Sequence, residues 1–158
     1  MKNAALFFLL AACAGLQSCK DDQKQKEAEA LKAESEKVVS TECYQAIYEE
    51  DTINLNVSTL KNGKIGGNLV MKVANVSEKN GDIKGEFRGD TLFVDYTFTD
   101  TANKNKTFKN PMAFLKRDKQ LILGNGSMQT TMGVTYLVKD KPIDFDRVKY
   151  KFDSINCK

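Results

Sequence analysis

The chain has 158 residues and contains no histidine. Histidine is the usual general base of Ser-His-Asp and Cys-His nucleophile systems, and it is a frequent zinc and copper ligand. Its absence excludes these nucleophile systems and every zinc or copper site built on histidine. The sequence therefore predicts no metal site, no cofactor and no catalytic residue.

Other signatures of catalysis are also missing. The chain has no Gly-rich phosphate loop, no Cys-x-x-Cys pair and no nucleophile elbow. Paired carboxylates would still allow acid–base hydrolysis, and Asp140, Asp144 and Asp146 form the nearest such cluster. Their spacing does not match an EF-hand loop, and we interpret them as a surface turn. A carboxylate-dependent hydrolase is thus the least favoured function, and we expect a protein that is not an enzyme.

A strong charge of one sign is missing as well. The chain carries 24 basic and 21 acidic residues, a net charge of +3. A charge this balanced gives no argument for a nucleic-acid partner or an acidic substrate. The lysines between positions 104 and 119 are interpreted as parts of a solvated loop and a strand edge.

The only long apolar run lies at the N-terminus, from Ala4 to Ala14. At about 11 residues it is too short to span a bilayer and is typical of a signal peptide. The next residues, Leu16-Gln17-Ser18-Cys19, resemble the lipobox of bacterial lipoproteins. The resemblance implies cleavage before Cys19 and acylation of its thiol, with chains such as palmitate that anchor the protein in a membrane. Cys13 is a rival, but it would leave a leader shorter than the roughly 15 residues expected.

The residues after the lipobox predict where the protein is held. Lys20-Asp21-Asp22 resembles the export signal of surface-exposed lipoproteins of the Bacteroidota, which implies an outer-membrane lipoprotein at the cell surface. A generic solvated tether is the alternative. Residues 20–42 are nearly all charged, Ala, Gln or Ser, without a heptad repeat, and indicate a flexible or helical tether. We therefore divide the chain into a signal peptide (1–18), a lipidated tether (19–42) and a folded domain (43–158).

Two cysteines remain once Cys13 is assigned to the leader and Cys19 to the lipid. Cys43 and Cys157 lie at the two ends of the folded domain. An exported protein meets an oxidising compartment, so we predict a disulfide between them. Two cysteines without a histidine would make a poor metal site. The bridge requires their Cα atoms to lie within about 7 Å, as in a closed barrel or two clipped edge strands.

The folded domain shows the period-2 alternation of half-buried strands, most clearly over 53–57 and 92–98. A polar loop is expected at 101–106 and a short helical turn at 142–147. Turn signals recur at the spacing of about 8–12 residues that is typical of antiparallel barrels and sandwiches. The sequence predicts an all-β domain, an antiparallel up-and-down meander of about eight or nine strands around one core. The predicted turns are Asn62-Gly63 (type I′), Asn80-Gly81, Gly89-Asp90 and Gly124-Asn125-Gly126.

Part of this domain resembles a known family. Gly81-Asp82-Ile83-Lys84-Gly85, followed by Gly89-Asp90-Thr91-Leu92 and Asp95-Tyr96-Thr97-Phe98, resembles the small lipocalin-like β-barrel lipoproteins of the Bacteroidota. The resemblance implies a barrel or half-barrel but no activity. Five aromatic side chains either line a ligand cavity in this barrel or fill its core. They are Tyr96, Phe98, Phe114, Tyr136 and Phe152.

Each Asp-Thr or Asp-Ser pair precedes a small or apolar residue, a pattern that resembles the O-glycosylation sequon of exported Bacteroidota proteins. The alternative is that these pairs mark the entry from a turn into a strand. Thr101, in the predicted polar loop, is the strongest candidate. The four candidate sites are Thr52, Thr91, Thr101 and Ser154.

An anchor, a spacer and a β domain without catalytic groups favour a membrane-anchored envelope lipoprotein that presents a binding domain. Its partner would be a small hydrophobic ligand, a glycan or an envelope protein. The alternative is a structural or assembly lipoprotein with a protein partner, which an exposed apolar patch and a closed interior would favour. The two hypotheses differ in whether the barrel interior is open or filled.

Overall fold

The structure is a computed structural model and describes residues 18–101 and 103–157. The chain divides into two units, Met1–Lys37 and Val38–Lys158, and each is described by itself. The predicted signal peptide up to Gln17 lies outside the described residues, as does the rival Cys13. Cys19 falls in the first turn of the helix of the first unit.

The first unit contains helix α1 (Ser18–Ser35), so this part of the predicted tether is helical. Ala, Glu, Lys and Gln dominate its sequence, and all four are strong helix formers. The side chains from Lys24 to Ala33 are all exposed, so this stretch has no face buried in a core. Near the helix end, Glu34 forms an ion pair with Lys37. Within the described residues, no helix combines the length and the apolar character needed to cross a bilayer.

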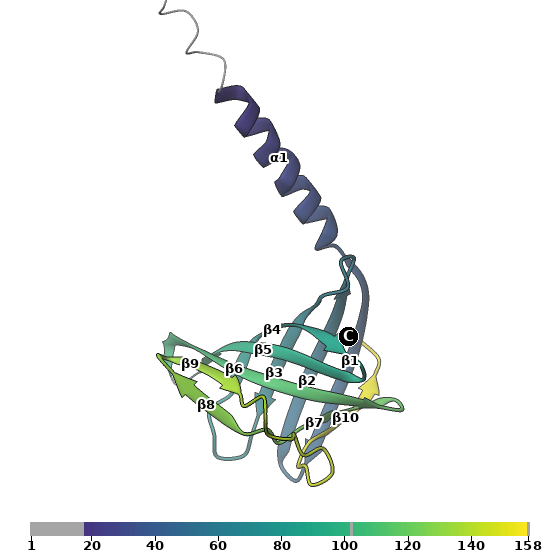
Figure 1. The fold of residues 1–158 in the computed structure, drawn as a ribbon. Coiled ribbons are helices and arrows are strands. Elements are labelled where there is room, and N and C mark those ends of the chain that lie inside the picture. Colours follow the sequence, from purple (N-terminus) through teal and green to yellow (C-terminus); the bar gives the residue numbers. More distant parts are fainter. Residues whose placement is uncertain (1–17, 102, 158) are drawn as a thin grey trace, which may run out of the picture. The chain divides into compact units, whose positions relative to one another are not determined.

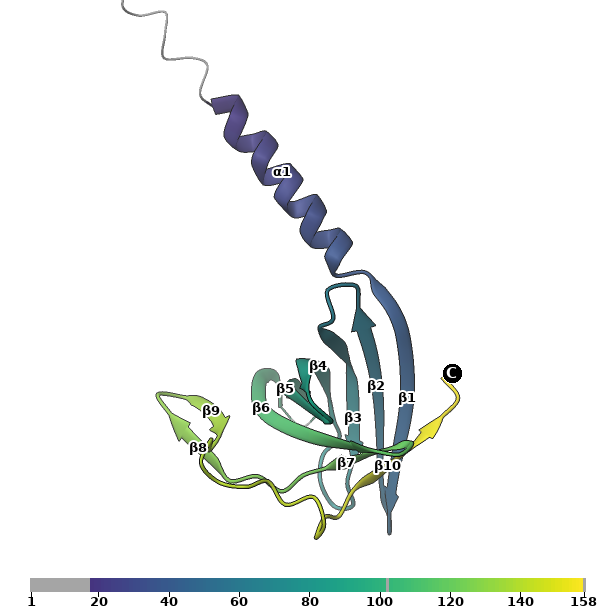
Figure 2. The same ribbon diagram turned by 45° about the vertical axis from the view of Figure 1, so that its right-hand side comes forward.

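The described part of the second unit is a β-barrel with an added hairpin. Eight antiparallel strands close in the order β1-β10-β7-β6-β5-β4-β3-β2, and β8 and β9 pair separately (Figures 1 and 2). This confirms the predicted all-β, up-and-down, lipocalin-like architecture, as a closed barrel rather than a half-barrel. The strands are β1 (Val38–Tyr48), β2 (Asp51–Leu60), β3 (Ile65–Lys72), β4 (Lys79–Arg88), β5 (Thr91–Asp100), β6 (Asn103–Arg117), β7 (Gln120–Leu123), β8 (Met128–Thr131), β9 (Val134–Leu137) and β10 (Lys151–Ile155).

The barrel closes where its first strand meets its last. β1 begins at Val38, earlier than the domain boundary expected at Cys43. β10 pairs with β1 over three residue pairs, one of them Cys43 with Ile155, and with β7 over three more. The predicted disulfide joins Cys43 to Cys157, with the Cα atoms 5.2 Å apart. The bridge therefore fastens the closing seam of the barrel.

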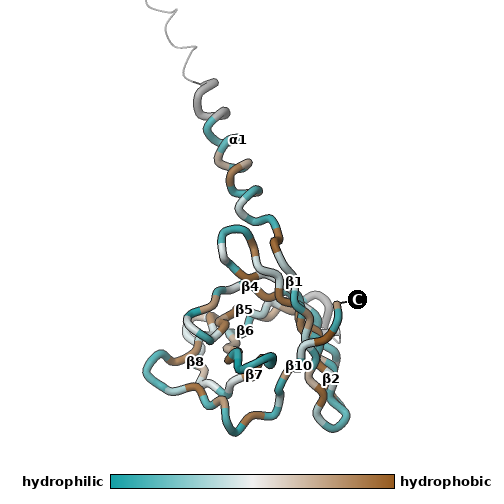
Figure 3. The backbone as a smooth tube through the Cα atoms, turned by 90° about the vertical axis from the view of Figure 1, so that its right-hand side faces the viewer, coloured by the Kyte–Doolittle hydropathy of each residue, from teal (hydrophilic) through white to brown (hydrophobic). Residues whose placement is uncertain are grey.

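The core lies inside the barrel, as the alternation predicts. On β2, the side chains of Ile53, Leu55 and Val57 are buried, and their neighbours in between are more exposed. Figure 3 shows hydrophobic positions along the strands and hydrophilic residues at several turns. Burial raises the pKa of the Tyr96 hydroxyl, which donates a hydrogen bond to the carbonyl oxygen of Leu69 at 3.0 Å. The buried Tyr96 phenol thus has a hydrogen-bond acceptor inside the barrel.

Three predicted turns differ from expectation. Gly124-Asn125-Gly126 is not a turn, and Asn125 forms a bridge with Asp144 instead. At the β2–β3 hairpin, Gly63 has φ 77°, but Asn62 is not left-handed, so the turn is not type I′. The Gly63 N–H donates to Leu60 O and the Leu60 N–H donates to Lys64 O, which closes a three-residue loop with a left-handed glycine. Asn80-Gly81 does not turn at all and lies within β4. The chain reverses before it, where Asn75 adopts φ 59°.

Two further expectations need correction. Most of the polar stretch predicted as a loop at 101–106 belongs to β6, which starts at Asn103 and pairs with β5. The segment 142–147 is not helical. It forms an isolated bridge between Asp144 and Asn125. The polar composition of residues 101–106 led to the wrong prediction of a loop. A barrel strand can also be polar along most of its length where its side chains face solvent.

Candidate functional site

Strand β6, with 15 residues, is paired on both sides over only part of its length. It pairs with β5 from Asn103 to Leu115, but with β7 only from Phe114 to Arg117. Just before the β7 ladder, the Ala113 carbonyl accepts a hydrogen bond from the Gly124 N–H at 2.9 Å.

The end of this ladder coincides with a proline. Backbone groups two residues apart on a strand point the same way, so Pro111 faces the same side as Ala113. Proline has no N–H to donate and is therefore found at strand edges. Pro111 thus ends the pairing, and the part of β6 that precedes it has no strand partner on its β7 side.

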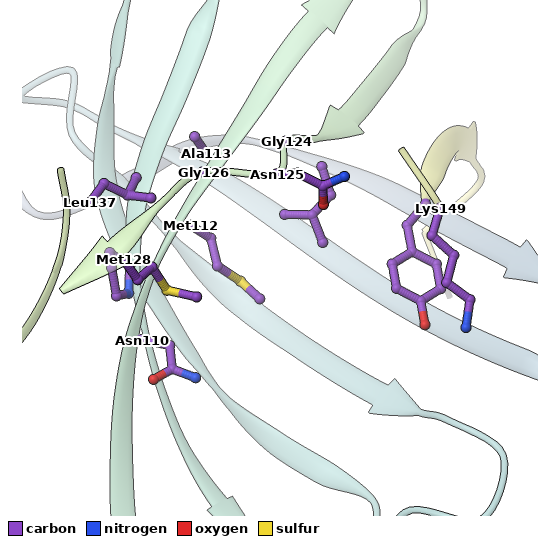
Figure 4. Close-up of a pocket in the computed structure, with 12 residues that line it drawn as sticks. Asn110, Met112, Ala113, Gly124, Asn125, Gly126, Met128, Leu137 and Lys149 are labelled. Atoms are coloured by element: carbon purple, nitrogen blue, oxygen red, sulfur yellow. The ribbon is translucent and has the colours of Figure 1, made fainter. Parts of the chain in front are cut away.

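A pocket of about 320 Å³ lies at this edge (Figure 4). β6 forms one side of it. The chain after β7, the β8–β9 hairpin and the two residues before β10 form the rest. A cavity of this size with a mainly apolar lining is typical of a small-molecule site. Its larger apolar residues are Pro111, Met112, Leu123, Met128, Leu137 and Tyr150.

The hairpin supplies the outer wall. Met128 and Leu137 are paired with each other at its base, and both line the pocket. Figure 4 shows them on one side of the pocket and Lys149 on the other. A Cβ atom at Gly126 would lie 2.5 Å from Leu137 Cδ2, so the Leu137 side chain packs closely over the backbone at Gly126. The wall is therefore held by packing as well as by the ladder between β8 and β9.

An ionic cluster around the buried Asp51 carboxylate fixes the opposite wall. Asp51, 4% exposed, accepts hydrogen bonds from the Ala74 N–H at 2.9 Å and the Tyr150 hydroxyl at 2.7 Å. Its Oδ2 also lies 2.7 Å from Lys149 Nζ, and that ammonium sits 4.9 Å from the centre of the Tyr48 ring. Residues 149–150 are thereby locked to β2 and to the end of β1.

The same cluster sets the charge at this wall. The Lys149 ammonium, with the Ala74 and Tyr150 hydrogen bonds, lowers the pKa of Asp51 to about 2. The hydrogen bond to Asp51 in turn raises the pKa of Lys149. Burial and the Asp51 carboxylate raise the pKa of the Tyr150 hydroxyl. At neutral pH the wall therefore holds a compensated ion pair and a neutral phenol.

Two asparagines supply the remaining polar groups of the pocket. Asn125 donates from Nδ2 to the Arg147 carbonyl at 2.8 Å, and its backbone pairs with Asp144. Asn110 makes no side-chain hydrogen bond among the described residues, so its amide can donate to and accept from a ligand. The pocket thus combines an apolar body with one available amide.

The five aromatic candidates do not line this pocket. Tyr96, Phe98, Phe114 and Phe152 are at most 6% exposed and pack in the barrel core. A side chain that lined an open cavity would keep accessible surface, so core packing is the better assignment for these four. Tyr136 is 40% exposed, on the hairpin face opposite Met128 and Leu137, because side chains alternate along β9.

The sequon residues occupy different settings. Thr52 and Thr91 are partly exposed at the start of β2 and β5, which suits the alternative of turn-to-strand entry. Ser154 is exposed inside β10, and Thr101 is exposed in the turn between β5 and β6. Of the two exposed candidates, Thr101 thus lies in a turn and Ser154 in a strand.

The acidic cluster forms a surface turn. Asp144 accepts hydrogen bonds from the N–H groups of Asp146 and Arg147 and from Arg147 Nε, and these lower its pKa. Asp146 lies 3.5 Å from Arg117. Each of these two carboxylates has a basic partner, as expected of a structural turn. Residues 18–101 and 103–157 contain no group of three or more side chains placed to hold a metal ion.

Comparison with known proteins finds no matching family model, no matching curated protein and no matching solved structure. Fold and pocket alone therefore define the class, a closed antiparallel barrel with a lateral apolar pocket. Its architecture is compatible with binding without catalysis.

One sequence signal could have indicated the site. Pro111 interrupts an otherwise regular strand pattern, and a proline there marks an unpaired edge. Met112 and Leu123 lie on strands, and Tyr150 directly precedes one. The sequence could not show that the hairpin folds back over them, because that contact depends on tertiary packing.

Proposed function

We propose that this chain is an envelope lipoprotein whose barrel binds a small apolar ligand in the pocket at the edge of β6. The observation that supports this most is the pocket itself, about 320 Å³ with mainly apolar walls. The burial of Tyr96, Phe98, Phe114 and Phe152 supports the same choice, because side chains at most 6% exposed offer a ligand almost no surface inside the barrel.

The polar groups favour a neutral ligand. Met112, Met128 and Leu137 would contact an apolar body, and the Asn110 amide would bind a hydroxyl, carbonyl or amide group. Lys149 is compensated by Asp51 at 2.7 Å. A ligand carboxylate would have to compete with that pair, so neutral lipids, alcohols and amides should bind better than fatty acids.

Displacement of a neutral fluorescent probe, Nile red, from the full chain would test this proposal. Neutral lipids should displace the dye with saturation, whereas glycans should not. Met128→Ala should weaken binding about three- to tenfold, because a partly buried apolar group is lost from the wall. Met132→Ala is the matched control, because Met132 is on the same hairpin but does not line the pocket. Equal affinities for the two variants, or no saturation with any ligand, would contradict the proposal.

We also propose that Cys19 carries the lipid anchor. Incorporation of an alkyne-labelled palmitate in cells would test it, with fractionation of membranes. Cys19→Ala should abolish labelling and release the protein from the membrane fraction, whereas Cys13→Ala should retain both. Label retained in Cys19→Ala and lost in Cys13→Ala would assign the lipid to the rival cysteine.

Thr101 is the proposed O-glycosylation site, because it is the exposed residue of a turn. Peptide mass spectrometry of protein from its native host should find a glycan mass on the Thr101 peptide and none after Thr101→Ala. An unmodified Thr101 peptide at full occupancy would reject this assignment.

A further inference from the structure

The tip of the β8–β9 hairpin is apolar and open to solvent. Met132 is 99% exposed and Val134 is 62% exposed. Isolated exposed apolar residues are ordinary, but these two lie on either side of Gly133 at the end of a projecting hairpin (Figure 1). Together they form the hairpin tip, residues 132–134.

The backbone conformation at position 132 is unfavourable for a methionine. Thr131 pairs with Val134, and the two residues between them, Met132 and Gly133, have φ 51° and 80°. Two positive φ values define a type I′ turn, whose first position strongly favours Asn, Asp or Gly. Met132 is thus an apolar side chain where both conformation and solvation favour a polar one. Folding does not account for it, which points to a partner that covers the tip.

The charges behind the tip select the kind of partner. The chain has no acidic residue from Lys119 to Lys139. Lys139 and Lys141 follow β9 and are exposed, with the exposed Asp140 between them.

The strand beside the hairpin adds further positive charge. β6 contacts β9 and carries the exposed Lys106 and Lys109. Lys109 is paired with Asp95 at 2.7 Å, so its charge is partly compensated. The segment after β9 and the neighbouring strand β6 therefore add positive charge beside the hairpin.

Polarity also changes in order along the hairpin. Met132 and Val134 are at the end, and the Tyr136 hydroxyl and Thr131 Oγ1 lie 3.2 Å apart behind them. The lysines follow at the base. From the tip inward, the side chains are apolar, then aromatic with a hydroxyl, then cationic. This order matches the depth profile of a membrane interface.

We propose that the hairpin tip inserts into a lipid surface, with a preference for anionic headgroups. A narrow convex tip suits the acyl boundary of a bilayer better than a protein interface, which usually needs about 1,000 Å² or more of complementary surface. The barrel would then contact the membrane through this tip independently of any lipid on Cys19.

The absence of tryptophan allows a direct test. Met132→Trp places a single tryptophan at the tip. Asp118→Trp is the matched control, since Asp118 is also exposed and left-handed, with φ 55°, in the two-residue turn between β6 and β7. Each full-length variant is mixed with phosphatidylcholine vesicles, with or without phosphatidylglycerol, some containing brominated acyl chains.

The tryptophan at 132 should shift its emission to the blue and be quenched by brominated lipid, more so with phosphatidylglycerol. The tryptophan at 118 should change little. Lys139→Glu with Lys141→Glu should remove the dependence on anionic lipid. Emission at 132 that matches the control would overturn the proposal. So would a blue shift without vesicles that grows with protein concentration, because a second copy of the chain would then cover the tip.

Discussion

Loss of the Cys43–Cys157 disulfide should destabilise the barrel strongly. The bond joins residues 114 positions apart. In the chain-entropy description, a cross-link over about a hundred residues restricts the unfolded chain by about 4 to 5 kcal/mol. Domains of this size are stable by only about 5–15 kcal/mol, so the double substitution to alanine should remove a large part of the total.

The position of the bridge predicts where this loss appears first. β10 joins β1 through three residue pairs and β7 through three more, whereas β4 and β5 share ten. Without the bridge, the β1–β10 seam should open before the rest of the barrel. Hydrogen exchange should therefore lose protection in β10 while β4 and β5 stay protected.

Urea unfolding of four samples separates the bond from side effects of substitution. The oxidised parent should be most stable, and the reduced parent, Cys157→Ala and the double variant should agree with one another. The cross-linked unfolded chain is more compact, so the oxidised parent should also show the smallest m-value. A difference below about 1 kcal/mol between oxidised and reduced parent, against the 4 to 5 expected, would refute the loop-entropy reasoning.

Four substitutions test other parts of the structure by urea unfolding. The pKa of Asp51 is lowered to about 2 in the folded protein. The contribution of its carboxylate to folding stability is therefore complete above the unfolded pKa of about 3.9, and it is lost as the pH falls toward 2. Asp51→Asn also leaves Lys149 unpaired, so it should lower the urea midpoint at pH 7. Between pH 4 and 2, the midpoint of the variant should fall less steeply than that of the parent. An equal slope in the two proteins would contradict this. Gly85→Ala should cost about 2–3 kcal/mol, because its Cβ would lie 1.9 Å from the Phe93 carbonyl oxygen, whereas Gly66→Ala meets nothing within 4 Å and should be nearly neutral. Phe114→Ala, at a fully buried position, should cost roughly 3–5 kcal/mol, and a loss below about 1 kcal/mol would return this side chain to the cavity hypothesis.

The parts of the fold that the sequence could predict are those set by local rules. Ile53, Leu55 and Val57 alternate with polar residues, so one face of their strand had to be buried. The disulfide followed from assigning the other two cysteines elsewhere. Both inferences needed only periodicity and counting, and neither depended on how distant segments pack.

The errors occur where a local signal has two meanings. Asn80-Gly81 reads as a turn, but a glycine is also required where a neighbouring strand comes close, and a Cβ at Gly81 would lie 2.1 Å from the Thr97 carbonyl oxygen. Tyr136 belongs to an alternating strand, but β9 pairs only with β8 in the described structure, so neither of its faces lies in the barrel core. The identity of the neighbouring strand decides both cases, and it is a tertiary property.

The candidate surfaces lie where the chain departs from local preference. Pro111 removes a donor from a strand and ends a ladder. Met132 places an exposed apolar side chain in a left-handed turn. Asp51 buries a carboxylate that then has to be compensated by Lys149. Each departure costs stability, and each borders the pocket or the hairpin rather than the opposite end of the barrel. Sequences that specify one fold keep such conflicts few and tend to place them at functional positions. The position of these three beside the pocket and the hairpin therefore agrees with a functional role there, independently of the size of the pocket.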